Sequence, residues 1–225
     1  MKRLIKILIV GTALISAPMI PAYASGSTDH HSSTGAEVVN GQLNLGNIWS
    51  QMNIDVAHVG GSVSAQVTAV GNTAEIITMT DSKVTNTQVN KGAVGAKLNA
   101  TVNHVEDNVI LGATAVCNAA DVSTDPQVTE VNSVQICKSP DPSAQVNAQV
   151  YNTGGDVGIA GTAIANQLQI DSNAASFPVH NDQENYSGMA SIVNAGVGNI
   201  AGDVSATSTA VGNSAQIVQY NTGGH

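Results

Sequence analysis

Hydrophobic and polar residues alternate along several stretches of this chain with the two-residue period of a β-strand. Between residues 63 and 69, valine and alanine occupy the odd positions, whereas serine, glutamine and threonine occupy the even ones. Gly71 and Asn72 interrupt the alternation, which resumes at Ala74 and Ile76. The pattern predicts two strands joined by a corner, which is the local arrangement of a β-arc.

The same pattern occurs four times without gaps, in units that begin 46, 48 and 47 residues apart. The units are residues 53–76, 99–122, 147–170 and 194–217. A first column of asparagine is Asn53, Asn99, Asn147 and Asn194. A threonine column is Thr68, Thr114, Thr162 and Thr209, and a second asparagine column is Asn72, Asn118, Asn166 and Asn213. Self-similarity at one period indicates a repeat architecture.

Strands built from small side chains cannot bury an apolar face alone, and only 3% of the residues are aromatic. Stacking solves this problem, because each valine or isoleucine then covers its counterpart in the next copy. We therefore predict an all-β fold, either a β-solenoid or a curli-like stack of β-arcs, with four units. Stacked asparagines would form amide ladders, or they would simply supply turn conformations. The spacing leaves open whether one unit makes one coil or two.

Composition divides the chain into three parts. Residues 1–24 have a basic start, an apolar stretch and an A-x-A site, as in a secretory signal peptide. Residues 25–36 are polar and are expected to be flexible, and 37–225 form a single repeat domain in which 37–52 cap the first coil. Every proline after residue 24 lies between units. We therefore expect the stretches between units to be looser and more solvated.

Charge and hydropathy restrict the location and the partners of the protein. The formal net charge is −9, and removal of residues 1–24 would make it −12 and leave no arginine. This balance argues against nucleic-acid binding, which needs phosphate-neutralising side chains. No apolar run after the leader reaches the ~18 to 20 residues of a membrane helix. We expect a secreted protein at the outer cell surface.

Candidate chemistry is sparse. Cys117 and Cys137 suit a disulfide in an oxidising compartment, with two free thiols as the alternative. His58 and His104 share one column, but no third metal ligand accompanies them. Asp156 and Asp203 share another column, which we interpret as a solvated polar row. Neither column suggests catalysis, so we expect no enzymatic activity, no cofactor and no metal.

Three phrases carry a family resemblance: "TAVGNTAEI" at 68–76, "QVNAQVYNTGGDV" at 145–157 and "TAVGNSAQI" at 209–217. With the leader, they resemble the holdfast-anchoring surface proteins of stalked bacteria, which are curli-like, over roughly residues 40–220. The resemblance implies an amyloid-like structural protein that tethers an adhesive polysaccharide to the envelope. It also implies export through a curli-type outer-membrane pore, and it carries over no catalytic residue.

Two functional hypotheses follow. The first is a secreted structural or adhesive protein that self-assembles into an amyloid-like β fibre and anchors an adhesin or a surface polysaccharide. The alternative is a monomeric extracellular β-solenoid module that binds polysaccharide. Fibre formation that depends on concentration would distinguish the two.

Overall fold

The computed structural model describes residues 7–12, 35–125, 129–174 and 176–220. The described residues form strands and connecting turns and contain no helix. Most of the predicted leader, 1–24, lies outside the described residues, and so does the predicted flexible segment except for its last two positions.

Twelve strands form four coils with three strands in each coil. The first coil is β2 (Ala36–Asn44), β3 (Ile48–Val59) and β4 (Val63–Thr78). The second is β5 (Ser82–Asn90), β6 (Val94–Val105) and β7 (Val109–Thr124). The third is β8 (Thr129–Cys137), β9 (Ser143–Thr153) and β10 (Val157–Ser172). The fourth is β11 (Val179–Asn185), β12 (Ala190–Ile200) and β13 (Val204–Gln219). One repeat therefore makes one coil.

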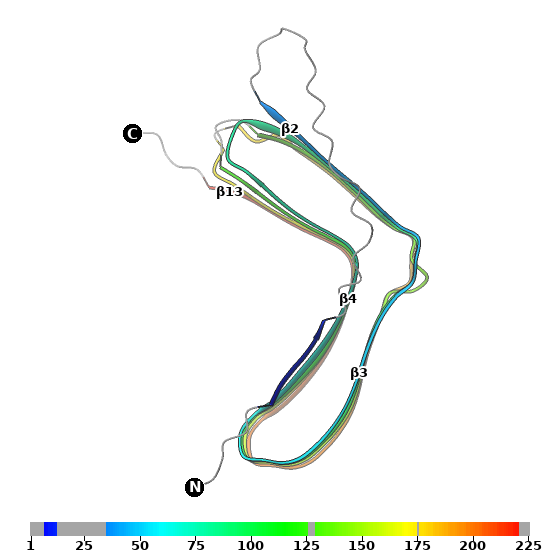
Figure 1. The fold of residues 1–225 in the computed structure, drawn as a ribbon, viewed down its shortest axis with the longest axis vertical. Coiled ribbons are helices and arrows are strands. Elements are labelled where there is room, and N and C mark those ends of the chain that lie inside the picture. Colours follow the sequence, from blue (N-terminus) through cyan, green and yellow to red (C-terminus); the bar gives the residue numbers. More distant parts are fainter. Residues whose placement is uncertain (1–6, 13–34, 126–128, 175, 221–225) are drawn as a thin grey trace.

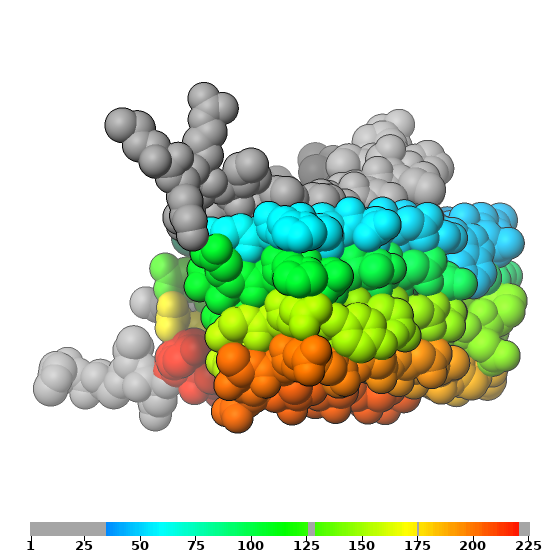
Figure 2. Space-filling view, turned by 90° about the horizontal axis from the view of Figure 1, so that it is seen from below, coloured from blue at the N-terminus to red at the C-terminus, as the bar shows by residue number. Residues whose placement is uncertain are grey.

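Equivalent strands of successive coils pair in parallel and form three sheets. Sheet A contains β4, β7, β10 and β13, sheet B contains β2, β5, β8 and β11, and sheet C contains β3, β6, β9 and β12. The register superimposes the repeat columns, so that Val63 pairs with Val109 and Val109 pairs with Val157. Figure 2 shows the coils as four layers in sequence order. The predicted β-solenoid is confirmed.

A further strand, β1 (Ile7–Thr12), lies at the outer edge of sheet A. It pairs in parallel with Val63–Thr68 of β4. This segment belongs to the predicted leader, and it occupies the edge of the first coil that faces away from the second.

The cross-section of the stack is bent, as Figure 1 shows near the label β4. The predicted corner at Gly71 and Asn72 is a bend inside one continuous 16-residue strand, not a break between two strands. Gly71 and Asn72 are both buried, so the alternation changes phase there. Odd positions face inward before the bend, and even positions such as Ile76 face inward after it.

The bend divides the interior into two apolar cores. Sheet C packs against the first half of sheet A through residues such as Leu98 and Leu111. Sheet B packs against the second half of sheet A through residues such as Val84 and Ile170. Small side chains suffice because each residue is also covered by its counterparts in the neighbouring coils.

The stretches between units are not the loose segments that the prolines suggested. Most of β5 and β8 is buried, and Val84 and Val131 are 0% exposed. Residues 37–52 are not a cap but supply β2 and the start of β3. A closed coil needs a third face opposite the second half of sheet A, and these segments supply it. Pro140, Pro142 and Pro178 lie in the short connections.

Candidate functional site: side-chain ladders and the open end of the stack

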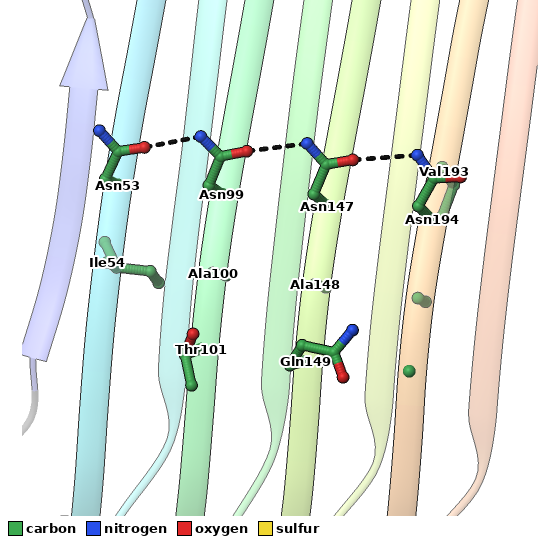
Figure 3. A pocket seen from close by; sticks show the side chains of 12 residues that line it. Asn53, Ile54, Asn99, Ala100, Thr101, Asn147, Ala148, Gln149, Val193 and Asn194 are labelled. Atoms are coloured by element: carbon green, nitrogen blue, oxygen red, sulfur yellow. Dashed lines mark hydrogen bonds between the residues drawn. The ribbon is translucent and has the colours of Figure 1, made fainter.

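The first asparagine column forms a ladder on the outer face of sheet C. Asn99 donates from Nδ2 to Oδ1 of Asn53 at 2.6 Å, and Asn147 donates to Asn99 at 2.8 Å. Asn194 continues the series by donating to Asn147 at 3.0 Å (Figure 3). Every amide of this ladder donates toward the preceding coil.

The second asparagine column forms a buried ladder inside the bend, and its direction is reversed. Asn72 donates to Asn118, Asn118 to Asn166 and Asn166 to Asn213, each at 2.8 Å. Asn118 and Asn166 are 0% exposed. Buried amides need partners, and stacking supplies one from each neighbouring coil.

A column of glutamines lies opposite this ladder. Its members fall outside the aligned units, so the comparison of the units did not identify them. The column is Gln42, Gln88, Gln135 and Gln183. Each later member donates to the Oε1 of the preceding one at 2.8–2.9 Å, and each also donates to a backbone carbonyl of sheet A. The residues recur at the period of the repeat, so a search of the inter-unit segments would have found them.

The threonine column lies on the outward side of sheet A. Thr68 pairs in register with Thr114, which in turn pairs with Thr162, and Thr162 pairs with Thr209. Thr68, Thr114 and Thr162 are partly exposed. The row supports the sheet through contacts between like residues on neighbouring strands.

Cys117 and Cys137 form a disulfide with a Cα–Cα distance of 6.0 Å. Cys117 lies at the bend of β7 in the second coil, and Cys137 ends β8 in the third coil. The bond therefore connects two successive coils at the place where both apolar cores meet.

The histidine column marks a backbone turn. His58 and His104 have φ values of 59° and 54°, and Asn152 and Asn199 continue the column at 55° and 57°. Histidine and asparagine are enriched in this left-handed conformation. The two imidazole rings stack with their centroids 4.8 Å apart. Among the described residues, no group of three or more potential metal ligands occurs.

The predicted acidic row lies in equivalent turns of successive coils and takes part in the hydrogen bonds that connect these turns. The backbone N–H of Asp156 donates to Oδ1 of Asn108 at 2.8 Å. The N–H of Asp203 donates to Oδ1 of Asp156 at 2.9 Å. Each of these accepting side chains therefore receives a hydrogen bond from the coil that follows it.

The outer face of sheet C also carries a shallow groove and two aromatic rings. The asparagine ladder lines the groove, as Figure 3 shows. The groove has a volume of about 920 Å³. Trp49 is 58% exposed and lies over Gly95 of the next coil. Tyr151 is 40% exposed and lies over Gly198 in the same way. The groove is therefore lined in part by amides, and the two aromatic rings lie on the same face of sheet C outside its lining.

Charge is nearly absent from this face. The outward positions of β3, β6, β9 and β12 carry one cation, Lys97, and one anion, Asp55. The perturbed titratable groups lie elsewhere. The Asn132 amide lowers the pKa of Glu130, and the Glu184 carboxylate raises the pKa of Tyr186 by accepting a hydrogen bond from its hydroxyl at 2.8 Å.

The fourth coil exposes side chains that are buried in the other coils. Val204 is 48% exposed, whereas its counterpart Val157 is 1% exposed. Ile217 is 46% exposed, whereas Ile170 is 0% exposed. The outer edges of β11, β12 and β13 pair with no further strand of the described chain. This end of the stack therefore presents both apolar side chains and unpaired backbone groups.

Within the described residues, no helix is long and apolar enough to cross a membrane. No curated protein and no solved structure matches the chain. The family described as holdfast attachment protein D matches residues 76–224, which include the second, third and fourth coils. This match covers well over half of the chain. The chain therefore belongs to the holdfast attachment protein D family and is a holdfast-related protein of the cell surface.

Proposed function

We propose that this protein is exported, self-associates into an amyloid-like β stack, and anchors the adhesive holdfast to the envelope. The proposal is supported by family membership and by the repeat ladders. The observation that carries it is the exposure of core valine and isoleucine side chains on the fourth coil. A solenoid that functions alone normally covers such an end with a polar capping repeat.

Two physical terms favour association at this end. Covering the exposed apolar side chains removes them from water. Pairing the free edges of β11, β12 and β13 satisfies backbone N–H and C=O groups that otherwise bind only water. After removal of residues 1–24, the formal charge of −12 opposes association through mutual repulsion, and salt screens that repulsion.

Export is part of the proposal. Residues 1–24 would act as the leader, and a curli-type outer-membrane pore would release the chain at the cell surface. The Cys117–Cys137 disulfide is consistent with this route, because such bonds persist in oxidising compartments.

The outer face of sheet C supports a role in contacting polysaccharide, either within the assembly or as the sole activity of a monomeric module. Trp49 and Tyr151 project from the same face, although they are far apart in the sequence. Exposed aromatic rings pack against the apolar faces of sugar rings, and the amides of the Asn99 ladder can bind hydroxyl groups. The near absence of charge on this face favours a neutral glycan.

Self-association is tested on the exported protein collected from cells that express the full-length gene. We expect sedimentation that depends on concentration, and fibre diffraction with spacings of about 4.8 and 10 Å. The double variant V204K/I217K should remain monomeric, because it places charges at inward positions of the open end. The matched variant S205K/Q216K places the same charges at outward positions of β13 and should still assemble. A wild-type protein that stays monomeric at every concentration would refute the proposal.

Polysaccharide contact is tested by retention of the exported protein on purified holdfast polysaccharide, with dextran as a control polymer. W49A/Y151A should lose most of the retention. Y186A/Y220A removes two exposed tyrosines that lie outside sheet C and should be retained like wild type. Equal retention of both variants would exclude this face as the contact.

A further inference from the structure

We infer that the partner at the open end is a second copy of this chain, seated head to tail. The first coil of one molecule then continues the fourth coil of another in the register of the repeat. This inference rests on the proposed self-association and adds its partner, polarity and register. The contacts across the junction would be Asn194 with Asn53, Gln183 with Gln42, Asn213 with Asn72, and Gly212 with Asn44.

The hydrogen-bond polarity of two ladders, the exposed Asn53 ladder and the buried glutamine ladder, makes the ends of the stack complementary. Each amide of the later coils donates to the preceding coil, so among the described residues Asn53 Nδ2 and the second N–H of Gln42 have no acceptor in a preceding coil. At the other end, Asn194 Oδ1 and Gln183 Oε1 receive no donor from a following coil of the described chain. The first coil therefore offers donors where the fourth coil offers acceptors.

The buried ladder is complementary in the opposite sense. Asn72 is 2% exposed, and its Oδ1 has no hydrogen-bond partner among the described residues. At the far end, Asn213 uses one N–H to bind the carbonyl of Gln183 at 3.0 Å. An amide nitrogen has two N–H groups, so the second one of Asn213 is available. Stacking another copy on the first coil would give the buried oxygen of Asn72 its missing donor.

Polarity excludes the symmetrical alternatives. If two first coils met, donors of the Asn53 and glutamine ladders would face donors, and the buried Asn72 oxygens would face each other. If two fourth coils met, acceptors of the Asn53 and glutamine ladders would face acceptors. Only a head-to-tail contact pairs all three ladders, and it also keeps the strands parallel as they are between coils. Such a contact does not close on itself, so it generates a filament.

The first coil already accepts a parallel strand at the required edge. β1 pairs with Val63–Thr68 of β4, residue by residue. In the inferred junction, Val204–Thr209 of β13 from another copy would take the place of β1 beside Val63–Thr68. The leader strand and a second copy therefore compete for the same edge. Removal of residues 1–24 would make this edge available.

The native disulfide identifies two positions in successive coils that lie close enough to be cross-linked, so the equivalent positions at the junction can test the register. It connects the bend of one coil to the end of the sheet B strand in the next coil. Across the inferred junction, the equivalent positions are Gly212 at the bend of β13 and Asn44 at the end of β2. Within one molecule these positions are three coils apart, roughly 14 Å at a strand spacing of about 4.8 Å. That separation is beyond the ~7 Å limit for Cα atoms in a disulfide.

The test is a double-cysteine variant, N44C/G212C, expressed from the full-length gene and collected after export. We expect a ladder of disulfide-linked multimers on non-reducing gels that collapses to monomer on reduction. Each single variant should give no ladder, and a mixture of the two single variants should give dimers only. A165C/N185C places the same pair between the third and fourth coils and should remain monomeric. N53C/G212C places the cysteines on different sheets and should not link.

A second variant tests the polarity without cysteines. N53D keeps the oxygen that accepts from Asn99 but replaces the free donor with a carboxylate facing Asn194 of the next copy. It should slow assembly at least tenfold at equal protein concentration. Q51E adds the same charge two residues away. It removes the bond that Gln51 donates to Asn53 Oδ1 within the coil but leaves the free donor of Asn53 in place, and it should assemble like wild type.

The outcomes separate this inference from the proposed function. Assembly of the wild type without N44C/G212C cross-links, or equal assembly of N53D and Q51E, would overturn the register and leave self-association standing. If N44C alone or G212C alone formed disulfide-linked dimers, two identical ends would be in contact. That result would indicate a symmetrical contact and would also overturn the inference. A wild-type protein that never assembles would refute both.

Discussion

Cys137 at the end of β8 is bonded to Cys117 in the bend of β7, at the place where Asn90 lies against Gly71 one coil earlier. Between the first three coils, the repeat therefore uses two solutions for one contact, and Ala165 and Asn185 occupy the same positions between the third and fourth coils. In one, a glycine leaves room for an asparagine that donates to the backbone at the bend. In the other, a covalent bond joins successive coils. The disulfide thus replaces a polar contact that belongs to the repeat.

Substitution of the disulfide by the repeat's own pair should be better tolerated than substitution by alanine. C117A/C137A should lower the free energy of unfolding by about 3 kcal/mol, because it removes the constraint of a 20-residue loop. C117G/C137N should lose less, since the introduced asparagine can enter the column that contains Asn90 and Asn185. Urea denaturation of the two variants measures the difference. An equal or greater loss for C117G/C137N would contradict the equivalence of the two contacts.

The buried and outer asparagine ladders should differ in their energetic importance. N118A leaves the Asn72 amide and the Asn166 oxygen buried without partners, at about 1–3 kcal/mol for each group. N99A breaks the corresponding bonds on a half-exposed face, where water can replace them, and should cost less than about 1 kcal/mol. Thermal and chemical denaturation compare the pair. Similar losses would mean that burial does not govern the ladder.

Gly71 should not tolerate a side chain, although it lies in a strand. A Cβ atom there would collide with the Asn90 amide and the Cys117 carbonyl. G71A should therefore cost more than about 1 kcal/mol, as overpacking does in other tight interiors. G158A is the control, because a Cβ at Gly158 meets nothing within 4 Å. If G71A and G158A have the same stability, the close contact at the bend does not restrict position 71 to glycine.

His104 should be replaceable by asparagine but not by valine. Its φ of 54° is the left-handed conformation, which costs a β-branched residue roughly 1–2 kcal/mol. Asn152 adopts the same conformation in the next coil, so H104N should be nearly neutral. Denaturation at neutral pH with and without a chelator provides the measurement. A chelator-dependent loss of stability in the wild type would instead indicate a bound metal.

The register of the repeat could be predicted because like residues recur at fixed intervals. Asn53, Asn99 and Asn147 occupy equivalent positions, and the structure pairs their strands in that alignment. The first strand of each coil could not be predicted in the same way. β5 and β8 lie between the aligned units and share few residue types, since Asn86 faces Ser133 and Thr87 faces Val134. Their burial depends on the opposing half of sheet A.

The candidate surfaces show the same limit. Trp49 and Tyr151 are scattered in the sequence, and only the stacking of β3 and β9 in one sheet places them on a common face. The hydrogen-bond polarity of the ladders at the open end was not predicted from the sequence either. In the glutamine ladder and the buried asparagine ladder, the amides also donate to backbone carbonyls, and those carbonyls come from another sheet.

The amino-acid sequence alone specified a period, a strand-forming composition and columns of identical residues. These features require stacking, because strands with small side chains bury enough apolar surface only when equivalent strands cover them on both sides. Packing between sheets specified the rest: the continuity of the strand through Gly71 and Asn72, the two cores, and the choice of a Cys117–Cys137 bond over two free thiols. Those properties depend on side chains from segments distant along the chain, and no local pattern encodes which of them meet.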